Sequence, residues 1–426
     1  MGNIRKLQII VLIAIAFAGG YYFGVNKVNL EWQNYKPVLS VSSKEPPAGI
    51  INVDFAPFWT VWEKLLVNYY DKSKLDQQKM LNGAISGMVD ALGDPFTLYL
   101  PPVLNNDFKQ GLAGQFSGIG AELGTKDKNI IVIAPLDGSP AQRAGIRAGD
   151  VIVGVNNEST AGWNLSQTVE KIRGPKGTDV TVSVVHKDTT KKADLKITRD
   201  IITVKSVVMD IRNAQCDDKN CKILGKTEPC RENCVKYTYM RLSQFGDNTN
   251  EEWLSLVKGI SDKIKEDKDI KGVVLDLRNN PGGYLSDATF IASEFIDVGK
   301  PVVSEENAVS GKKTTYATRK GLLTAVRIIV LINKGSASAS EIVSGALRDN
   351  NRAKLVGETS FGKGTIQAAE DLGDGAGVHI TIAKWLTPNG MWVNEKGLTP
   401  DVTISLDEKD PARDTQLEKG VFELLK

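Results

Sequence analysis

The spacing of apolar residues changes along the chain and predicts parts of different kinds. An uncharged run extends over 7–23. Between 55 and 92 the apolar residues recur at helical spacing, which predicts two amphipathic helices. From 116 to 186, short apolar runs alternate with glycine-rich turns, as in a compact domain of strands. Beyond 201, buried strands alternate with helices, which predicts a mixed α/β core.

Individual elements follow from the same pattern. In the strand-rich part we predict strands and short helices over the ranges 130–133, 139–145, 150–156, 165–172 and 180–186. In the α/β part we predict strands at 272–278 and 327–332, and helices over 251–266, 286–295, 338–349 and from about 412 onward.

Composition narrows the classes of function. The chain has 53 Lys and Arg against 51 Asp and Glu, a net charge of +2, so nucleic acid is not expected as a partner. Its hydrophobic share of 41% excludes a wholly disordered chain. The only histidines are His186 and His379, so a multi-histidine metal site or a Ser-His-Asp triad is not expected. We expect both histidines to be structural.

The N-terminal residues 1–25 have the features of a signal or anchor segment. Arg5 and Lys6 precede the uncharged run, which favours an N-terminus in the cytoplasm and the remaining chain outside it. Small residues at 14–18 resemble signal-peptide cleavage sites, but they lie inside the apolar run, so the uncleaved anchor is favoured. Proline and serine residues in 26–50 predict a linker.

All four cysteines fall within 212–236, at positions 216, 221, 230 and 234. In an oxidising compartment the expected outcome is two disulfides, for which there are three pairings. A tetrahedral zinc site and free thiols remain alternatives. The surrounding residues are polar, so we interpret the segment as an exposed insertion that adds local stability.

The first candidate for chemistry is Ser338, which follows a buried strand and a turn of small residues and stands before a helix. Backbone N–H groups at a helix start favour developing negative charge, which suits a nucleophilic serine. The alternative is a simple helix cap, because Ser338 and Glu341 also form a capping-box pattern.

The second candidate is the segment 357–367, which contains Lys363 and Gln367. It nearly matches a phosphate-binding loop, but Gly364 stands where that loop needs Ser or Thr. A Ser-x-x-Lys pair of Ser360 and Lys363 is a weaker alternative, and the simplest interpretation is a solvated lysine in a loop.

A third feature, Asn279-Asn280-Pro281-Gly282-Gly283, follows the strand at 272–278. Two glycines at a strand end leave backbone N–H groups open to a ligand. Without context, the simpler interpretation is an ordinary turn.

The part from 109 to 205 resembles a PDZ domain through "GIGA", "SPAQRAGIRAGDVIVGVNN" and "KIRG". PDZ domains bind a peptide C-terminus as an added strand. Ser117, Gly118, Ile119 and Gly120 could form the loop whose free amides hold the carboxylate, because glycine lets the backbone come close.

Taken with these features, the chain from 53 to 402 resembles the carboxyl-terminal processing (tail-specific) peptidases. The segments that carry the resemblance are "DPFTLYL", "GVVLDLRNNPGG", "NKGSASASEI", "GETSFGKGTIQ" and "KWLTPNG". These are Ser-Lys proteases that carry a PDZ domain. The resemblance implies that Ser338 is the nucleophile, Lys363 the general base and Gln367 the residue that orients the lysine. The amides of Ala339 and of Gly282 or Gly283 would form the oxyanion hole. The cysteine segment has no counterpart in the family pattern.

A neutral lysine is the chemical requirement of this hypothesis. Lys363 can accept the proton of Ser338 only if burial lowers its pKa well below about 10.4. Neighbouring glycines allow a close approach, and we expect the ring of Phe361 to shield the amine.

The predicted fold class is a mixed α/β multidomain protein: an N-terminal helical region (51–108), the PDZ domain (109–205) and a protease core (206–426). The predicted function is a serine endopeptidase that recognises exposed apolar C-terminal tails of extracytoplasmic proteins and needs no cofactor or metal. We expect a membrane anchor and consider a homodimer. The alternatives are an inactive PDZ scaffold and, disfavoured by Gly364, a phosphate-binding NTPase.

Overall fold

The computed structural model describes residues 28–33, 36–41, 53–126, 129–136, 138–186, 189–225, 228–407, 410 and 413–426. Two compact units emerge, Met1–Met80 and Leu81–Lys426. The uncharged run and the predicted anchor lie outside the described residues. Within the described ranges, no helix is long and apolar enough to cross a membrane.

The first unit contains a hairpin where the composition predicted only a linker. Strands β1 (Val28–Gln33) and β2 (Lys36–Val41) pair antiparallel. The alternation of Val28, Leu30 and Trp32 with polar residues has the period of a strand, and the prolines nearby obscured it. Helix α2 (Ala56–Asn68) and the turn η1 (Lys72–Lys74) follow.

The two predicted N-terminal helices are present as α2 and α3 (Gln77–Asp90), and α3 runs from the first unit into the second. In the second unit, Val89 of α3 packs with Tyr99 of β3 (Leu98–Leu100) and with Ala376. Helix α4 (Pro102–Leu112) was not predicted, although Leu104, Phe108 and Leu112 recur at helical spacing, because its other residues are mostly polar and it begins at the second of two prolines.

A PDZ-like module forms around one sheet with strand order β10-β9-β7-β6-β5, and β8 adds to β7. Among the strands that the structure describes, the edge strand β5 pairs with β6 alone, and helix α6 packs against it. Separately, β4 (Gln115–Gly118) pairs with β11 (Asp200–Thr203) where the chain enters and leaves the module. The remaining bounds are β5 (Ala121–Lys126), β6 (Asn129–Pro135), α5 (Pro140–Arg143), β7 (Val151–Val155), β8 (Glu158–Ser159), α6 (Leu165–Ile172), β9 (Asp179–Val185) and β10 (Lys192–Thr198).

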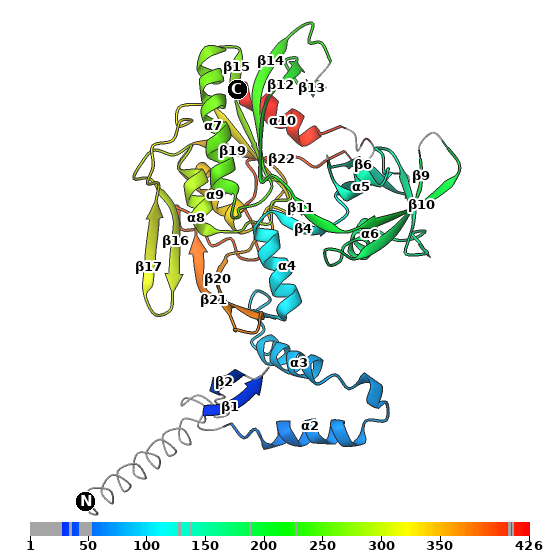
Figure 1. Cartoon of the computed structure of the whole chain (residues 1–426). Coiled ribbons are helices and arrows are strands. Elements are labelled where there is room, and N and C mark those ends of the chain that lie inside the picture. Colours follow the sequence, from blue (N-terminus) through cyan, green and yellow to red (C-terminus); the bar gives the residue numbers. More distant parts are fainter. Residues whose placement is uncertain are drawn as a thin grey trace, which may run out of the picture. The chain divides into compact units, whose positions relative to one another are not determined.

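The α/β core, drawn from green to red in Figure 1, is built on a seven-stranded sheet. Its strand order is β13-β12-β14-β15-β18-β19-β22. Strands β14 to β22 of this order run parallel, whereas β12 is antiparallel to both of its neighbours. The strands are β12 (Val207–Cys216), β13 (Cys221–Ile223), β14 (Cys234–Leu242), β15 (Ile270–Asp276), β18 (Ile328–Ile332), β19 (Ala353–Gly357) and β22 (Val402–Thr403).

Helices cover both faces of this sheet because its central strands are apolar on both sides. Ile328, Val330 and Ile332 pack on the side of α7 (Thr249–Glu266), α8 (Leu285–Ala292) and α9 (Ala339–Asp349). Ile329 and Leu331 pack on the side of α10 (Thr415–Leu424). Because both faces of these parallel strands are buried, their sequences are continuous apolar runs. The predicted mixed α/β core is confirmed.

A second sheet includes β20 (Thr365–Asp371), the strand that follows the 357–364 loop. Its order is β17-β16-β21-β20, and β3 pairs with β21. Its strands are β16 (Pro301–Asn307), β17 (Gly311–Tyr316), β20 (Thr365–Asp371) and β21 (Gly377–Leu386). The β3–β21 pairing brings the sequence "DPFTLYL" beside this sheet.

Most of the described residues in 212–236 are exposed, but the interpretation of the segment as an insertion separate from the core is wrong at its two ends. Strands β12 and β14 are paired members of the core sheet, so the segment begins and ends within it. Disulfides join Cys216 to Cys221 and Cys230 to Cys234, as expected for an oxidising compartment. Cys216 and Cys221 are buried and share a cluster with residues of α10.

We predict that the buried disulfide contributes more stability than the partly exposed one. Both close short loops, so each adds a similar entropic contribution of about 2 kcal/mol to the free energy of unfolding. Replacing Cys216 and Cys221 by alanine also removes packing against α10. Urea unfolding of this double variant is expected to give a larger loss than the matched Cys230→Ala/Cys234→Ala variant. Equal losses would contradict the prediction.

Candidate active site

Ser338 stands at the junction of β18 and α9 with a strained backbone. It is the N-cap residue of α9, with φ 54° and ψ −115°. A serine in this region costs energy that the surroundings must supply, and such strain is typical of functional sites. The N–H of the preceding residue, Ala337, donates to the carbonyl of Asn280 at 3.0 Å and holds the turn.

The carboxylate of Glu341 connects this turn to the 357–364 loop. Glu341 is fully buried. One oxygen accepts from Ser360 Oγ at 2.6 Å and from Gly362 N at 2.7 Å. The other oxygen accepts from Ser338 N at 2.8 Å and from Lys363 N at 2.9 Å. Burial raises the pKa of Glu341, and the hydrogen bonds oppose the rise.

Sequence reasoning treated Glu341 only as a helix-capping residue. The capping bond to Ser338 N is present, but the same carboxylate also organises the distant loop. The S-x-x-E pattern was therefore a signal for this residue, although it could not reveal the second set of partners, which lie far along the chain.

The two weaker alternatives for this loop do not fit the structure. Ser360 is buried, donates to Glu341 and accepts from Leu398 N at 2.6 Å, so its hydroxyl is committed to structural bonds. The amides of Gly362 and Lys363 bind Glu341, and that of Gly364 binds Asn394 Oδ1 at 3.2 Å. A phosphate-binding loop needs such amides free for the phosphate.

Lys363 lies half-buried beneath an aromatic ring. Its Nζ is 5.1 Å from the ring centre of Phe96. Burial lowers the pKa of Lys363, and the negative charge of Asp94 opposes this shift. The expectation that Phe361 shields the amine is wrong, because Phe361 is 56% exposed; the ring comes instead from "DPFTLYL", more than 260 residues earlier.

Gln367, on β20, contacts hydroxyls. Its Nε2 donates to Thr365 Oγ1 at 2.9 Å and to Thr381 Oγ1 at 3.1 Å. In the part of the chain that the structure describes, no hydrogen bond joins Gln367 to Lys363. Thr381 N in turn donates to Thr97 Oγ1 at 3.0 Å, so β21 holds Gln367 beside the "DPFTLYL" segment.

The histidines have structural surroundings. His379 on β21 is buried, and its ring lies edge-on to Phe108 at 4.4 Å. Burial, together with the charge of Lys363, lowers the pKa of His379. In the PDZ-like module, His186 Nδ1 lies 2.9 Å from Asp150 Oδ1.

Gly282 and Gly283 lie so close to neighbouring atoms that a side chain at either position would collide with them. A Cβ at Gly282 would lie 2.8 Å from Ser338 Cβ and 3.0 Å from Ala339 N. A Cβ at Gly283 would lie 1.7 Å from the carbonyl oxygen of Phe245. Gly282 N donates to Asn280 Oδ1 at 2.9 Å, whereas among the described residues the amides of Gly283 and Ala339 have no acceptor.

The predicted carboxylate loop of the PDZ-like module is shorter than expected. Ser117 and Gly118 belong to β4 and pair with β11, which removes them from a free loop. Ile119 and Gly120 connect β4 to β5, and within the described chain their amides donate to no acceptor. Gly120 has φ 74°, and a Cβ there would lie 2.5 Å from Ser139 Cβ.

The α/β core places Gly282 beside Ser338, and Glu341 bonds the backbones of Ser338 and Lys363. The comparisons with known proteins identify this combination of a PDZ domain and an α/β core as that of a serine peptidase. Three family models match: peptidase family S41 over 236–404, the PDZ domain over 107–185 and the activating protease CtpB N-terminal domain over 14–102. The chain belongs to the carboxy-terminal processing proteases of peptidase family S41.

Proteins similar to this one match between 82% and 98% of the chain. Carboxy-terminal processing protease CtpB of Bacillus subtilis is 33% identical over 98% of this chain and 81% of its own length. Carboxy-terminal processing protease CtpA of the same organism is 35% identical over 82% and 68%. Among solved structures, the photosystem II D1 C-terminal processing protease is 30% identical, with a TM-score of 0.50, and covers 82% of this chain and 86% of its own.

We predict that Glu341→Gln lowers both stability and peptidase activity. The substitution keeps the size of the side chain but puts an NH2 group against two N–H or O–H donors. Unsatisfied buried donors cost about 1–3 kcal/mol each, so with two such donors the free energy of unfolding should fall by about 2–6 kcal/mol. Urea unfolding and substrate turnover measure the two effects. Glu370→Gln, at an exposed position of β20, is the control, and equal behaviour of the two variants would contradict the role of Glu341.

Proposed function

We propose that this protein is a Ser-Lys endopeptidase that binds the C-terminal tails of extracytoplasmic proteins and cleaves those proteins. Membership in the family makes it a serine peptidase with a PDZ domain. The observation that carries the more specific proposal is the Glu341 carboxylate, which bonds the backbones of both Ser338 and Lys363. Two candidate residues that are 25 positions apart are thereby anchored to one group.

Ser338 acts as the nucleophile. Neutral Lys363 takes the proton of Ser338 Oγ, and the oxygen forms a bond to the scissile carbonyl carbon. Collapse of the tetrahedral intermediate breaks the C–N bond, and the amine leaves with the proton that Lys363 returns. Water then attacks the ester, again with Lys363 as the base, and releases the acid and Ser338.

The oxyanion is stabilised by backbone amides. Ala339 N is at the start of α9, and the contact between Gly282 and Ser338 brings the 279–283 loop beside it. Gly283 N has no acceptor among the described residues, while Gly282 N is already bonded to Asn280. This supports Gly283 rather than Gly282 as the second donor.

Lys363 is the general base because burial makes its neutral form accessible. Gln367 orients Lys363 in the catalytically competent arrangement. Two observations support this role. Gln367 lies on β20, the strand that begins directly after the Lys363 loop. Its side chain is also held in place by hydrogen bonds to Thr365 and Thr381.

Tail recognition uses the edge of the PDZ sheet. In the described part of the chain, strand β5 pairs on one side only, so a peptide can add beside it, next to α6. The unbonded amides of Ile119 and Gly120 supply donors for the terminal carboxylate, and Ser117 and Gly118 form the strand that leads to them. We propose apolar tails as the preferred ligands.

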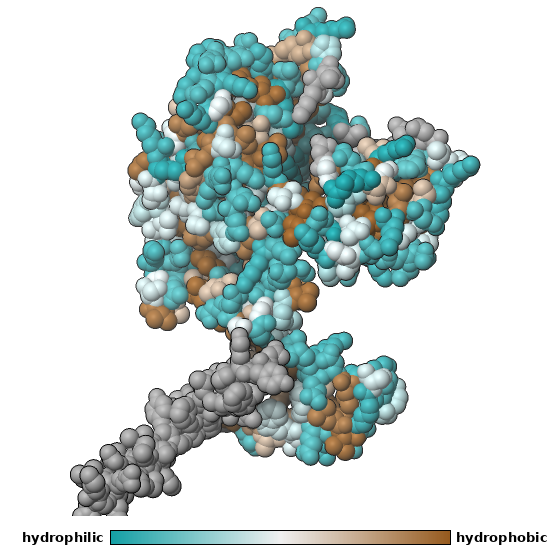
Figure 2. Space-filling view, viewed as in Figure 1, coloured by the Kyte–Doolittle hydropathy of each residue, from teal (hydrophilic) through white to brown (hydrophobic). Residues whose placement is uncertain are grey.

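The extracytoplasmic location rests on the anchor predicted within 1–25 and on the two disulfides, which persist in oxidising compartments. Homodimer formation is supported by α2, on which no residue is buried within the chain. Apolar side chains gather on this segment (Figure 2), including Phe58, Trp59, Val61, Leu65 and Val67.

We predict that Ser338→Ala and Lys363→Ala each abolish cleavage of an unstructured protein that ends in apolar residues. Loss of the nucleophile or of its base removes the covalent step, so turnover should fall by more than about 1000-fold. Lys334→Ala, an exposed lysine of the same turn, is the control and should cleave normally. Tail binding without any wild-type cleavage would support the scaffold alternative instead.

We predict that kcat/KM rises with pH as Lys363 loses its proton. Because burial lowers the pKa of Lys363, the rise should be centred below the ordinary value of about 10.4. Phe96→Ala admits water to the amine and should move the rise to higher pH, with lower activity at pH 7. The exposed Phe361→Ala is the matched control, and an unshifted profile in Phe96→Ala would contradict the shielding role.

A further inference from the structure

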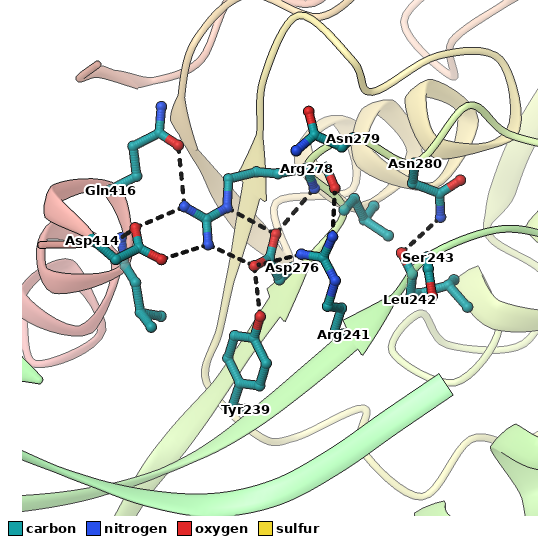
Figure 3. Close-up of polar contacts among 12 residues, drawn as sticks. Tyr239, Arg241, Leu242, Ser243, Asp276, Arg278, Asn279, Asn280, Asp414 and Gln416 are labelled. Carbon is teal, nitrogen blue, oxygen red and sulfur yellow. Dashed lines mark hydrogen bonds and ion pairs between the residues drawn. The ribbon is translucent and has the colours of Figure 1, made fainter. Parts of the chain in front are cut away.

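A buried group of charged residues lies at the base of the 279–283 loop. Asp276, the last residue of β15, is fully buried and accepts hydrogen bonds from Arg278 Nε at 2.9 Å and Arg278 Nη2 at 2.7 Å. Tyr239 Oη donates to Asp276 at 2.7 Å, and Arg241 Nη1 lies 3.3 Å away (Figure 3). Two arginines therefore share one carboxylate.

Asp414, the residue that precedes helix α10, provides a second carboxylate for Arg278. Asp414 accepts from Arg278 Nη1 at 2.7 Å and from Arg278 Nη2 at 2.8 Å, as a bidentate pair (Figure 3). Gln416 Oε1 adds a contact to Nη1 at 3.2 Å. Asp276 and Asp414 together balance the charges of Arg241 and Arg278, so loss of either carboxylate leaves excess positive charge around a buried site.

Asp414 is itself fixed to the fold through α10. Its side chain caps that helix by accepting from Leu417 N at 2.9 Å. The helix packs on the face of the sheet opposite α9, through Leu417, Val421 and Leu424. The position of Arg278 is therefore tied to a helix that contributes none of the proposed catalytic residues.

The loop after Arg278 is bonded directly to the turn that carries Ser338. Asn279 N donates to Asn333 Oδ1 at 2.8 Å, and Asn333 Nδ2 donates back to Asn279 Oδ1 at 2.8 Å. Asn280 O accepts from Ala337 N at 3.0 Å and from Ser340 Oγ at 2.8 Å. A displacement of Arg278 would therefore pass into the loop and shift Gly283 relative to Ser338.

We propose that Asp414 is a positioning residue for the oxyanion hole, which acts through Arg278 on the 279–283 loop. This inference rests on the proposed function, because it assigns a role to the same loop. It makes the C-terminal helix part of the catalytic apparatus without any contact to the substrate.

The test is steady-state kinetics of full-length Asp414→Asn with an unstructured protein substrate that ends in apolar residues. Asparagine still caps a helix, so α10 should persist, but the ionic part of the pair with Arg278 is lost. We expect kcat to fall at least about tenfold, because small misplacements of reacting groups have large effects on rate, and KM to stay within about twofold. Asp414→Glu keeps the charge and should retain a kcat between those of Asp414→Asn and the wild type.

The control is Arg413→Ala, which removes the neighbouring pair with Glu418, at 2.8 Å, and does not reach the 279–283 loop. Thermal unfolding followed by circular dichroism identifies a temperature at which every variant is folded, and kinetics are compared there. Wild-type kcat in Asp414→Asn, an equal fall in Arg413→Ala, or a change confined to KM would overturn the inference. If Ser338→Ala were fully active, the proposed function itself would fail, which is a separate outcome.

Discussion

The buried carboxylate of Glu341 is the interaction on which the candidate site depends. It receives four donors from two segments of the chain, and two of these donors are the backbone N–H groups of Ser338 and Lys363. A buried acceptor of this kind must be satisfied, so the helix start and the loop cannot separate without leaving charged or polar groups unpaired. The strained φ of Ser338 is maintained by the same bonds.

The pairing order of the strands determines which loops and side chains surround this carboxylate. The parallel order β15-β18-β19 brings the loops that follow β15, β18 and β19 to one edge of the core sheet, where the glycine loop, Ser338 and Lys363 follow one another in space. The second sheet adds Gln367 and, through the β3–β21 pairing, the Phe96 segment. Glycine at 282 and 283 is what allows the backbones to approach so closely.

Much of the fold could be predicted because local patterns agreed with the final packing. The continuous apolar run at 328–332 and the helical spacing at 251–266 correspond to β18 and α7. The predictions failed where local pattern and tertiary role diverge. The end of β12 and the start of β14 were included in the predicted insertion at 212–236, because polar residues dominate that segment. Helix α4 was missed although Leu104, Phe108 and Leu112 recur at helical spacing, because its other residues are mostly polar and it begins at the second of two prolines.

The sequence by itself determined the family resemblance, the candidate residues Ser338, Lys363 and Gln367, and the demand for a neutral amine, because these depend on residue type and on short spacings. Tertiary structure alone decided which groups surround them. That Phe96 covers Lys363, that Glu341 bonds the Lys363 loop, and that Asp414 pairs with Arg278 are contacts between residues far apart in the chain. Such contacts are fixed by strand order and by the burial of charge, which no local pattern specifies.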